Sequence, residues 1–222
     1  MRKDSIKKKY IITAVCAIVI VTIVLLGIGS EVVMANNPPV SYENYNYTTK
    51  TFETKICPSY GILTGNNNSD ITTEISGWYV IDEDVEISGL IRVVGTANLI
   101  LKDECKLTAS KGINVATGSA LTIYGQGGIN GENAVIGQLI CFGTINQAGI
   151  GGDNNQTAGS ITINGGEVTA TSKNGAGIGG GNGRDGGNIT INGGKVTATG
   201  YDGAGIGGGI DGAGGNITIN GG

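Results

Sequence analysis

The sequence predicts an all-β chain that coils as a parallel β-helix, a solenoid in which each circuit of the chain lies over the previous one. Three observations predict it: short apolar alternations recur every six to eight residues from Trp78 onward, the motif ITINGG occurs three times, and the motif GAGIGGG occurs twice. ITINGG begins at Ile161, Ile189 and Ile217, and GAGIGGG begins at Gly175 and Gly203. Both motifs therefore return at one constant interval, and a fixed repeat of this length is typical of a solenoid.

The N-terminal segment has the layout of a secretory signal, with five basic residues before an apolar run from Ile11 to about Gly29. Compact residues before Ala35 favour cleavage after that position, so we expect residues 1–35 to be a signal peptide. The run is also about long enough to cross a bilayer, and its basic flank would stay inside, so an uncleaved N-terminal membrane anchor is the alternative. Either reading predicts that residues 36–222 are extracellular or lie in the cell envelope.

Composition excludes several classes of function. Nine of the 14 basic residues and 16 of the 18 acidic residues follow position 35, which gives residues 36–222 a net charge of −7. An acidic chain is a poor ligand for nucleic acid, because phosphates must be neutralised by clustered Lys and Arg. The chain contains no histidine, which excludes Ser-His-Asp and Cys-His catalysis.

Three cysteines follow the expected signal peptide, namely Cys57, Cys105 and Cys141, and no C-x-x-C spacing suggests a metal site. One disulfide with a free thiol and no disulfide at all are both compatible with an odd number of cysteines in a secreted chain.

Polar and aromatic residues alternate along residues 36–75, which are expected to form a linker and an irregular segment that leads into the repeats. Their tyrosines have two interpretations: they stack on sugar rings, or they cover the adjacent domain, and the second is favoured. These tyrosines are Tyr42, Tyr45, Tyr47 and Tyr60.

Residues 76–222 are expected to form the β-helix, because their alternations are too short for helices and suit strands with one buried face. We expect strands at 85–87, 91–93, 99–101, 106–108, 113–115 and 121–123. Every third one matches best, which predicts three strands per circuit, with Ile91 under Ile113 and Leu99 under Leu121.

The exact repeat in the C-terminal part assigns the inward and outward faces, since successive strand residues point to opposite sides. Five aliphatic residues of one circuit point inward with five of the next directly above them: Ile161, Ile163, Val168, Ala170 and Ile178, then Ile189, Ile191, Val196, Ala198 and Ile206. The same step predicts a column of amides at Asn164, Asn192 and Asn220, and an opposite-charge pair between Glu167 and Lys195.

The GAGIGGG motif contains the letters of a phosphate-binding loop, G-x-G-x-x-G, but the context argues for a structural role. A nucleotide loop needs a strand before it and a helix after it, and here more glycine and another strand follow. We therefore assign its glycines to sharp turns of the circuit, where they permit a positive φ.

Candidate catalytic groups are sparse. Four aspartates fall in expected turns: Asp153, Asp185, Asp202 and Asp211. No acidic residue stands one repeat before or after any of them, so they do not stack into an acidic column. Only Arg92 and Arg184 are arginines beyond position 35. Glycoside hydrolysis needs two facing carboxylates. We therefore expect no enzyme, no catalytic, cofactor-binding or metal residues, and no identifiable ligand-binding residue.

Threonines form a regular outward pattern on the expected strands. Thr169, Thr171, Thr197 and Thr199 would stand in ranks on one face, and Thr162, Thr190 and Thr218 in a column on another. Such ranks can order water or donate hydrogen bonds to a polysaccharide, but threonine is also simply a good exposed strand residue, which is the favoured interpretation.

The stretches WYVIDEDVEISGLIRV, LILKDECKLTASKGINV and LTIYGQGG, with the two repeated motifs, resemble secreted β-helical surface proteins of Gram-positive anaerobes, which are similar in turn to pectate-lyase-like carbohydrate-binding proteins. The resemblance covers residues 76–222 and implies a right-handed β-helix, display at the cell envelope and binding of polysaccharide or a host or cell-wall surface, sometimes with calcium. No binding motif is matched, and no clear ligand set supports calcium.

The sequence thus predicts a non-catalytic extracellular or cell-surface repeat protein for adhesion or carbohydrate binding. A β-helix polysaccharide lyase or hydrolase is the alternative, and a purely structural surface spacer is a further one. Because the chain stops at Gly222 directly after ITINGG, where earlier circuits continue, we also expect the β-helix to be incomplete at its C-terminus.

Overall fold

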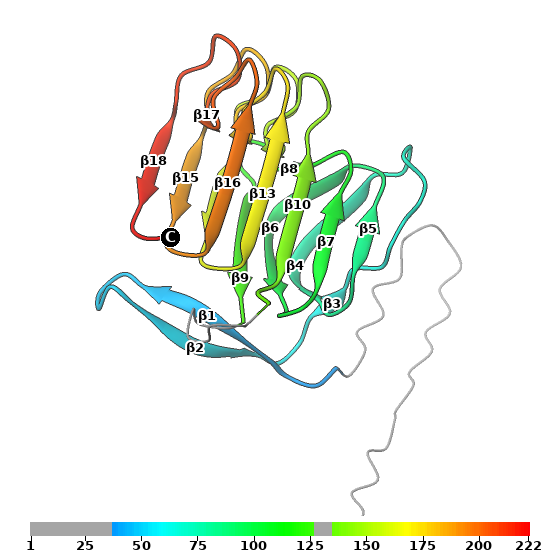
Figure 1. The fold of residues 1–222 in the computed structure, drawn as a ribbon, viewed down its shortest axis with the longest axis vertical. Coiled ribbons are helices and arrows are strands. Elements are labelled where there is room, and N and C mark those ends of the chain that lie inside the picture. Colours follow the sequence, from blue (N-terminus) through cyan, green and yellow to red (C-terminus); the bar gives the residue numbers. More distant parts are fainter. Residues whose placement is uncertain (1–36, 127–134) are drawn as a thin grey trace, which may run out of the picture. The chain divides into compact units, whose positions relative to one another are not determined.

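The computed structural model describes residues 37–126 and 135–222, and within them every regular element is a β-strand. One five-stranded parallel sheet contains β5 (Val85–Ile87), β7 (Lys106–Ala109), β10 (Gln138–Phe142), β13 (Glu167–Ser172) and β16 (Lys195–Gly200), side by side in that order (Figure 1). This sheet carries one strand from each successive circuit.

A second, eleven-stranded sheet supplies the other two sides of each circuit. It starts with β3 (Gly61–Ile62), which pairs with β4 (Thr73–Ile81), and β4 pairs in turn with β6 (Ile91–Leu101). One branch continues through β8 (Ile113–Asn114), β11 (Ile150–Gly151), β14 (Ile178–Gly179) and β17 (Ile206–Gly207). The other continues through β9 (Ala120–Gly125), β12 (Ser160–Ile163), β15 (Asn188–Ile191) and β18 (Asn216–Ile219). Three strands per circuit, each parallel to its counterpart, make a parallel β-helix and confirm the predicted fold class.

The long strand β6 joins the two branches. Its first residues pair with β8, and residues 96–101 pair with β9, so the strands expected at 91–93 and 99–101 are parts of one strand.

The predicted register of the early circuits is right at one position and wrong at another. Ile91 pairs with Ile113 as expected, but Leu99 pairs with Ile123 and not with Leu121. The reason is the turn between β8 and β9, closed by a hydrogen bond from Ser119 N to Ala116 O (2.9 Å). That turn is two residues longer than the corresponding bend of β6. Residues after the turn therefore pair at a sequence separation two residues greater than that between Ile91 and Ile113.

The repeat interval of the C-terminal circuits is confirmed in all three of their strands. Ile161 pairs with Ile189, Val168 with Val196, and Ile150 with Ile178 and then Ile206. The inward residues of the first of these circuits are all buried in one continuous hydrophobic core, which explains why the repeat preserves them.

Glycine is required in the short strands because neighbouring circuits approach each other closely there. Gly151, Gly179 and Gly207 have φ of 141°, 136° and 137°. A Cβ at Gly151 would lie 2.0 Å from the carbonyl oxygen of Gly179, and one at Gly179 equally close to Gly207. The glycines of GAGIGGG thus serve chain stacking, and among the residues that the structure describes no helix follows them.

Two predicted side-chain columns are present. Asn192 Nδ2 donates to Asn164 Oδ1 (2.7 Å), and Asn220 Nδ2 donates to Asn192 Oδ1 (2.7 Å), which gives the expected amide ladder. Lys195 Nζ donates to Glu167 Oε1 at 2.6 Å across neighbouring circuits.

Residues 40–57 depart from the irregular segment that the sequence predicts, since β1 (Val40–Asn46) and β2 (Thr51–Cys57) form an antiparallel hairpin. The tyrosines are the physical reason. Tyr42 packs against Trp78 and Tyr124 of the β-helix, with ring centroids 5.0 and 4.7 Å apart, and Tyr45 packs against Phe52 within the hairpin. The interpretation that these tyrosines cover the adjacent domain is therefore confirmed for Tyr42, whereas the ring contacts of Tyr45 lie within the hairpin.

The distal end of the hairpin touches the C-terminal circuits as well. Asn192 Nδ2 donates to the Tyr47 hydroxyl (3.1 Å), and a Cβ at Gly193 would meet the Phe52 ring at 2.7 Å. The hairpin therefore bridges several circuits of the β-helix from outside.

The expected signal peptide or anchor at residues 1–35 lies outside the described residues. In the two described ranges no helix is long and apolar enough to cross a membrane. Cys57, Cys105 and Cys141 are free thiols in the structure, the first and last of them buried.

Candidate binding pocket

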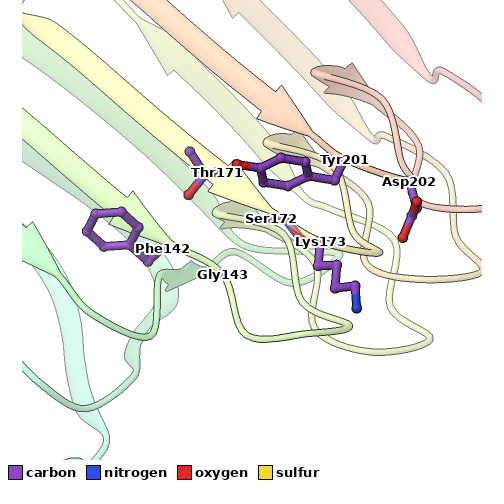
Figure 2. Close-up of a pocket in the computed structure, with 7 residues that line it drawn as sticks. All are labelled: Phe142, Gly143, Thr171, Ser172, Lys173, Tyr201 and Asp202. Atoms are coloured by element: carbon purple, nitrogen blue, oxygen red, sulfur yellow. The ribbon is translucent and has the colours of Figure 1, made fainter.

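A surface pocket of about 470 Å³ lies where β10, β13 and β16 end (Figure 2). It is lined by Phe142, Gly143, Thr171, Ser172, Lys173, Tyr201 and Asp202. These residues come from three successive circuits, so the pocket exists only because the circuits stack.

Strand register explains how the lining residues meet. Phe142 at the end of β10 pairs with Thr171 of β13, which pairs in turn with Thr199 of β16. Tyr201 follows β16 and lies in the circuit after that of Lys173. The backbone amide of Tyr201 donates to Ser172 O (3.1 Å), which fixes this position. Outward positions of three circuits are thereby gathered at one end of the five-stranded sheet.

Two exposed aromatic side chains flank the pocket. Phe142 is 46% exposed and Tyr201 is 77% exposed. Figure 2 shows them on either side of the Thr171 side chain, with the Tyr201 ring extending toward Thr171. Alternation explains the placement of Phe142, because its neighbour Cys141 points into the core and Phe142 must then point out.

The pocket floor is fixed by buried hydrogen bonds. Ser172 Oγ donates to Gln147 O (2.6 Å) and accepts from Gly175 N (3.0 Å). Gly143 N donates to Thr171 O (2.8 Å), and a Cβ at Gly143 would lie only 2.4 Å from Gln147 O. The floor is therefore preformed, and glycine is needed at position 143.

The pocket carries one cation and one carboxylate. Lys173 and Asp202 are joined through the backbone, where Asp202 N donates to Lys173 O (2.8 Å). Neither side chain forms an ion pair within 37–126 and 135–222. Figure 2 shows both on the Tyr201 side of the pocket, with Phe142 on the opposite side.

The aspartates considered from the sequence are not brought together. Asp202 lines the pocket, whereas Asp185 Oδ1 accepts from Ala213 N (2.8 Å) and Asp153 Oδ1 accepts from Asn154 N (2.7 Å) in turns elsewhere. No group of three His, Cys, Asp or Glu side chains in the described part of the chain could hold a metal ion.

The predicted threonine ranks are in register, since Thr169 pairs with Thr197 and Thr171 with Thr199. Thr162, Thr190 and Thr218 form the expected column on the other sheet. The ranks of the five-stranded sheet end at β10, where Ile140 pairs with Thr169 and Phe142 pairs with Thr171. The interruption by β10 is what creates the pocket, because an aromatic ring stands where the next circuits have a hydroxyl.

The groups with the largest pKa shifts lie outside the pocket. Burial raises the pKa of Tyr124, under the hairpin, to about 12. Burial also raises the pKa of the inward Cys141 thiol. These shifts follow from packing and point to no chemistry of their own.

Sequence reasoning assigned no ligand-binding residue and did not single out Phe142, Lys173 and Tyr201, which line this pocket. A signal was present, since Tyr201 stands one repeat after Lys173, whereas the inward residues and the GAGIGGG stretch of the same two circuits are repeated unchanged. Outward positions at which a regular repeat breaks are where a ligand site is expected.

Comparison with known proteins supports the repeat architecture. Residues 161–182 and 189–210 match the beta helix repeat family. No curated protein and no solved structure matches the chain.

Proposed function

We propose that this protein is a non-catalytic extracellular or cell-surface repeat protein that binds polysaccharide at the pocket between Phe142 and Tyr201. The observation that carries the proposal is the pair of exposed aromatic rings over a preformed floor. Aromatic faces pack against the apolar faces of sugar rings, and a few placed polar groups then fix orientation. The hydroxyl of Thr171 and the charged ends of Lys173 and Asp202 supply such groups.

The extracellular address rests on the N-terminal sequence, as a secretory signal or a membrane anchor. The resemblance to secreted β-helical surface proteins supports the same address. An extracellular protein with a glycan-binding pocket would adhere to a glycan-bearing surface, of a host or of a cell wall, and adhesion is therefore the role that we propose.

The content of the pocket favours binding over turnover. Among the described lining residues Asp202 is the one carboxylate, whereas glycoside hydrolysis uses two that face each other across the bond. The proposal includes no cofactor.

A glycan array probed with the purified protein, with and without calcium, tests the proposal. We expect glycan binding that is weakened in Tyr201→Ala. Absence of binding in both conditions would contradict carbohydrate recognition and favour the structural spacer. Release of unsaturated product from polygalacturonate would instead establish a lyase.

A further inference from the structure

We infer that the ligand of the pocket is an uncharged β-1,4-linked polysaccharide whose sugars carry equatorial hydroxyls, bound along an internal stretch of its chain across β10, β13 and β16. This inference rests on the proposed function and narrows its substrate class. Charge, ring geometry and pocket direction each contribute one step.

The charges of the site favour a neutral ligand. The pocket offers one ammonium and one carboxylate, Lys173 and Asp202, so its formal charges cancel. The nearby charges on the same sheet are already paired, since Lys195 contacts Glu167 at 2.6 Å. A polyuronate would bring a carboxylate with every sugar against a single lysine and a chain with a net charge of −4, at a cost in repulsion.

The aromatic rings favour sugars with flat apolar faces. Neither Phe142 nor Tyr201 is in the ring pairs formed among the described aromatic residues, so each offers a free face to a ligand. A pyranose whose hydroxyls are all equatorial exposes only C–H groups above and below the ring, and such a face stacks on an aromatic face. An axial hydroxyl would interrupt that contact.

The direction of the pocket favours an extended chain. Phe142 ends β10 and Tyr201 follows β16, two strands farther along the axis, which corresponds to roughly 10 Å at the usual strand spacing. An extended β-1,4-linked disaccharide has about this length, and its alternate units present equivalent faces. Two alternate units, separated by one disaccharide repeat, can therefore contact the two rings while the unit between them meets Thr171.

The polar side chains suit the edges of such a ligand. Equatorial hydroxyls point outward in the plane of the sugar ring, where the Asp202 carboxylate can accept hydrogen bonds and the Lys173 ammonium can donate them. Neither side chain is ion-paired with another described residue, so binding breaks no ion pair among them.

Calorimetric titration of the protein with cellohexaose, β-1,4-mannohexaose and hexagalacturonate tests the inference. The second sugar differs by an axial hydroxyl, and the third is acidic and α-linked. We expect cellohexaose to bind best. We expect Tyr201→Ala and Phe142→Ala each to weaken it roughly three- to tenfold, as loss of one aromatic contact predicts, and Tyr201→Phe to bind as the parent does. Ile56→Ala removes an exposed apolar side chain of the hairpin and is the matched control.

The outcomes separate the inference from the proposed function. Preferred binding of hexagalacturonate that depends on Tyr201 would overturn the inference and leave the proposed function standing. Equal affinity for cellohexaose and mannohexaose would overturn the requirement for equatorial hydroxyls. Cellohexaose binding unchanged by both aromatic substitutions would overturn the site, and no binding of any glycan would overturn inference and proposed function together. Far-UV circular dichroism of each variant shows whether the fold is retained.

Discussion

Replacing Ile163 by alanine tests the stacking of successive circuits quantitatively. Ile163 is fully buried, and its strand neighbours in register are Ile123 and Ile191, which are buried as well. Truncation of such a side chain removes its transfer free energy and leaves a cavity between two circuits, for which isoleucine-to-alanine changes cost about 2 to 5 kcal/mol. With covered neighbours on both sides, we expect a loss of about 3 to 4 kcal/mol in the free energy of unfolding.

The repeat itself provides the control. Ile219 occupies the same position of the same ITINGG motif but is 64% exposed. Ile219→Ala is expected to cost less than about 1 kcal/mol, because little apolar surface leaves the core. Urea unfolding followed by circular dichroism measures both variants. Equal losses of stability in the two variants would refute the reasoning, since local sequence and not burial would then decide the effect. No loss for Ile163→Ala would also refute it, since the side chain would then not be packed between circuits.

Three further predictions concern the ladder, the ion pair and the buried thiol. Asn192→Ala is expected to lower the free energy of unfolding by about 2 to 3 kcal/mol, because it removes two ladder hydrogen bonds and leaves a buried amide oxygen without a donor. A loss below about 0.5 kcal/mol in the same urea assay would show that the ladder is dispensable. The hydrogen bond from Lys195 lowers the pKa of the Glu167 carboxyl, so the pair stabilises above the carboxyl's ordinary pKa and this contribution is lost as pH falls through the lowered one. Lys195→Gln should therefore remove part of the acid sensitivity, at most about 1 kcal/mol for an exposed pair, and an unchanged pH profile of stability would contradict this. Burial raises the pKa of Cys141, so an aromatic disulfide reagent at mildly alkaline pH should modify it far more slowly than the half-buried Cys105, and similar rates by mass spectrometry would count against the inward position.

The sequence was sufficient for the architecture because the core is periodic. Ile161 and Ile189 occur in identical motifs, and a constant repeat length leaves a single way to stack them. The amide ladder and the Glu167–Lys195 pair followed from the same step. Where circuits differ in length the rule fails, and the register of Leu99 was wrong because one turn holds two additional residues.

The hairpin and the pocket could not be predicted from periodicity. The hairpin bridges circuits through contacts as distant in sequence as Tyr47 and Asn192, and no repeat encodes them. The pocket brings together Phe142 and Tyr201, which lie two circuits apart, through outward residues that differ between circuits. Pattern analysis finds what repeats, whereas this site is built where the repeat is broken.

Cross-linking of engineered cysteines tests most directly the claim that residues one repeat apart lie over one another, on which both core and pocket depend. Thr171 and Thr199 are outward partners on adjacent parallel strands, within the separation that a disulfide spans. Under mild oxidation the account predicts a disulfide in Thr171→Cys/Thr199→Cys, found by mass spectrometry of the digested protein, and none in Thr171→Cys/Thr197→Cys, whose partners are offset along the strand by two residues. Cross-linking of the offset pair in preference to the aligned pair would contradict the account.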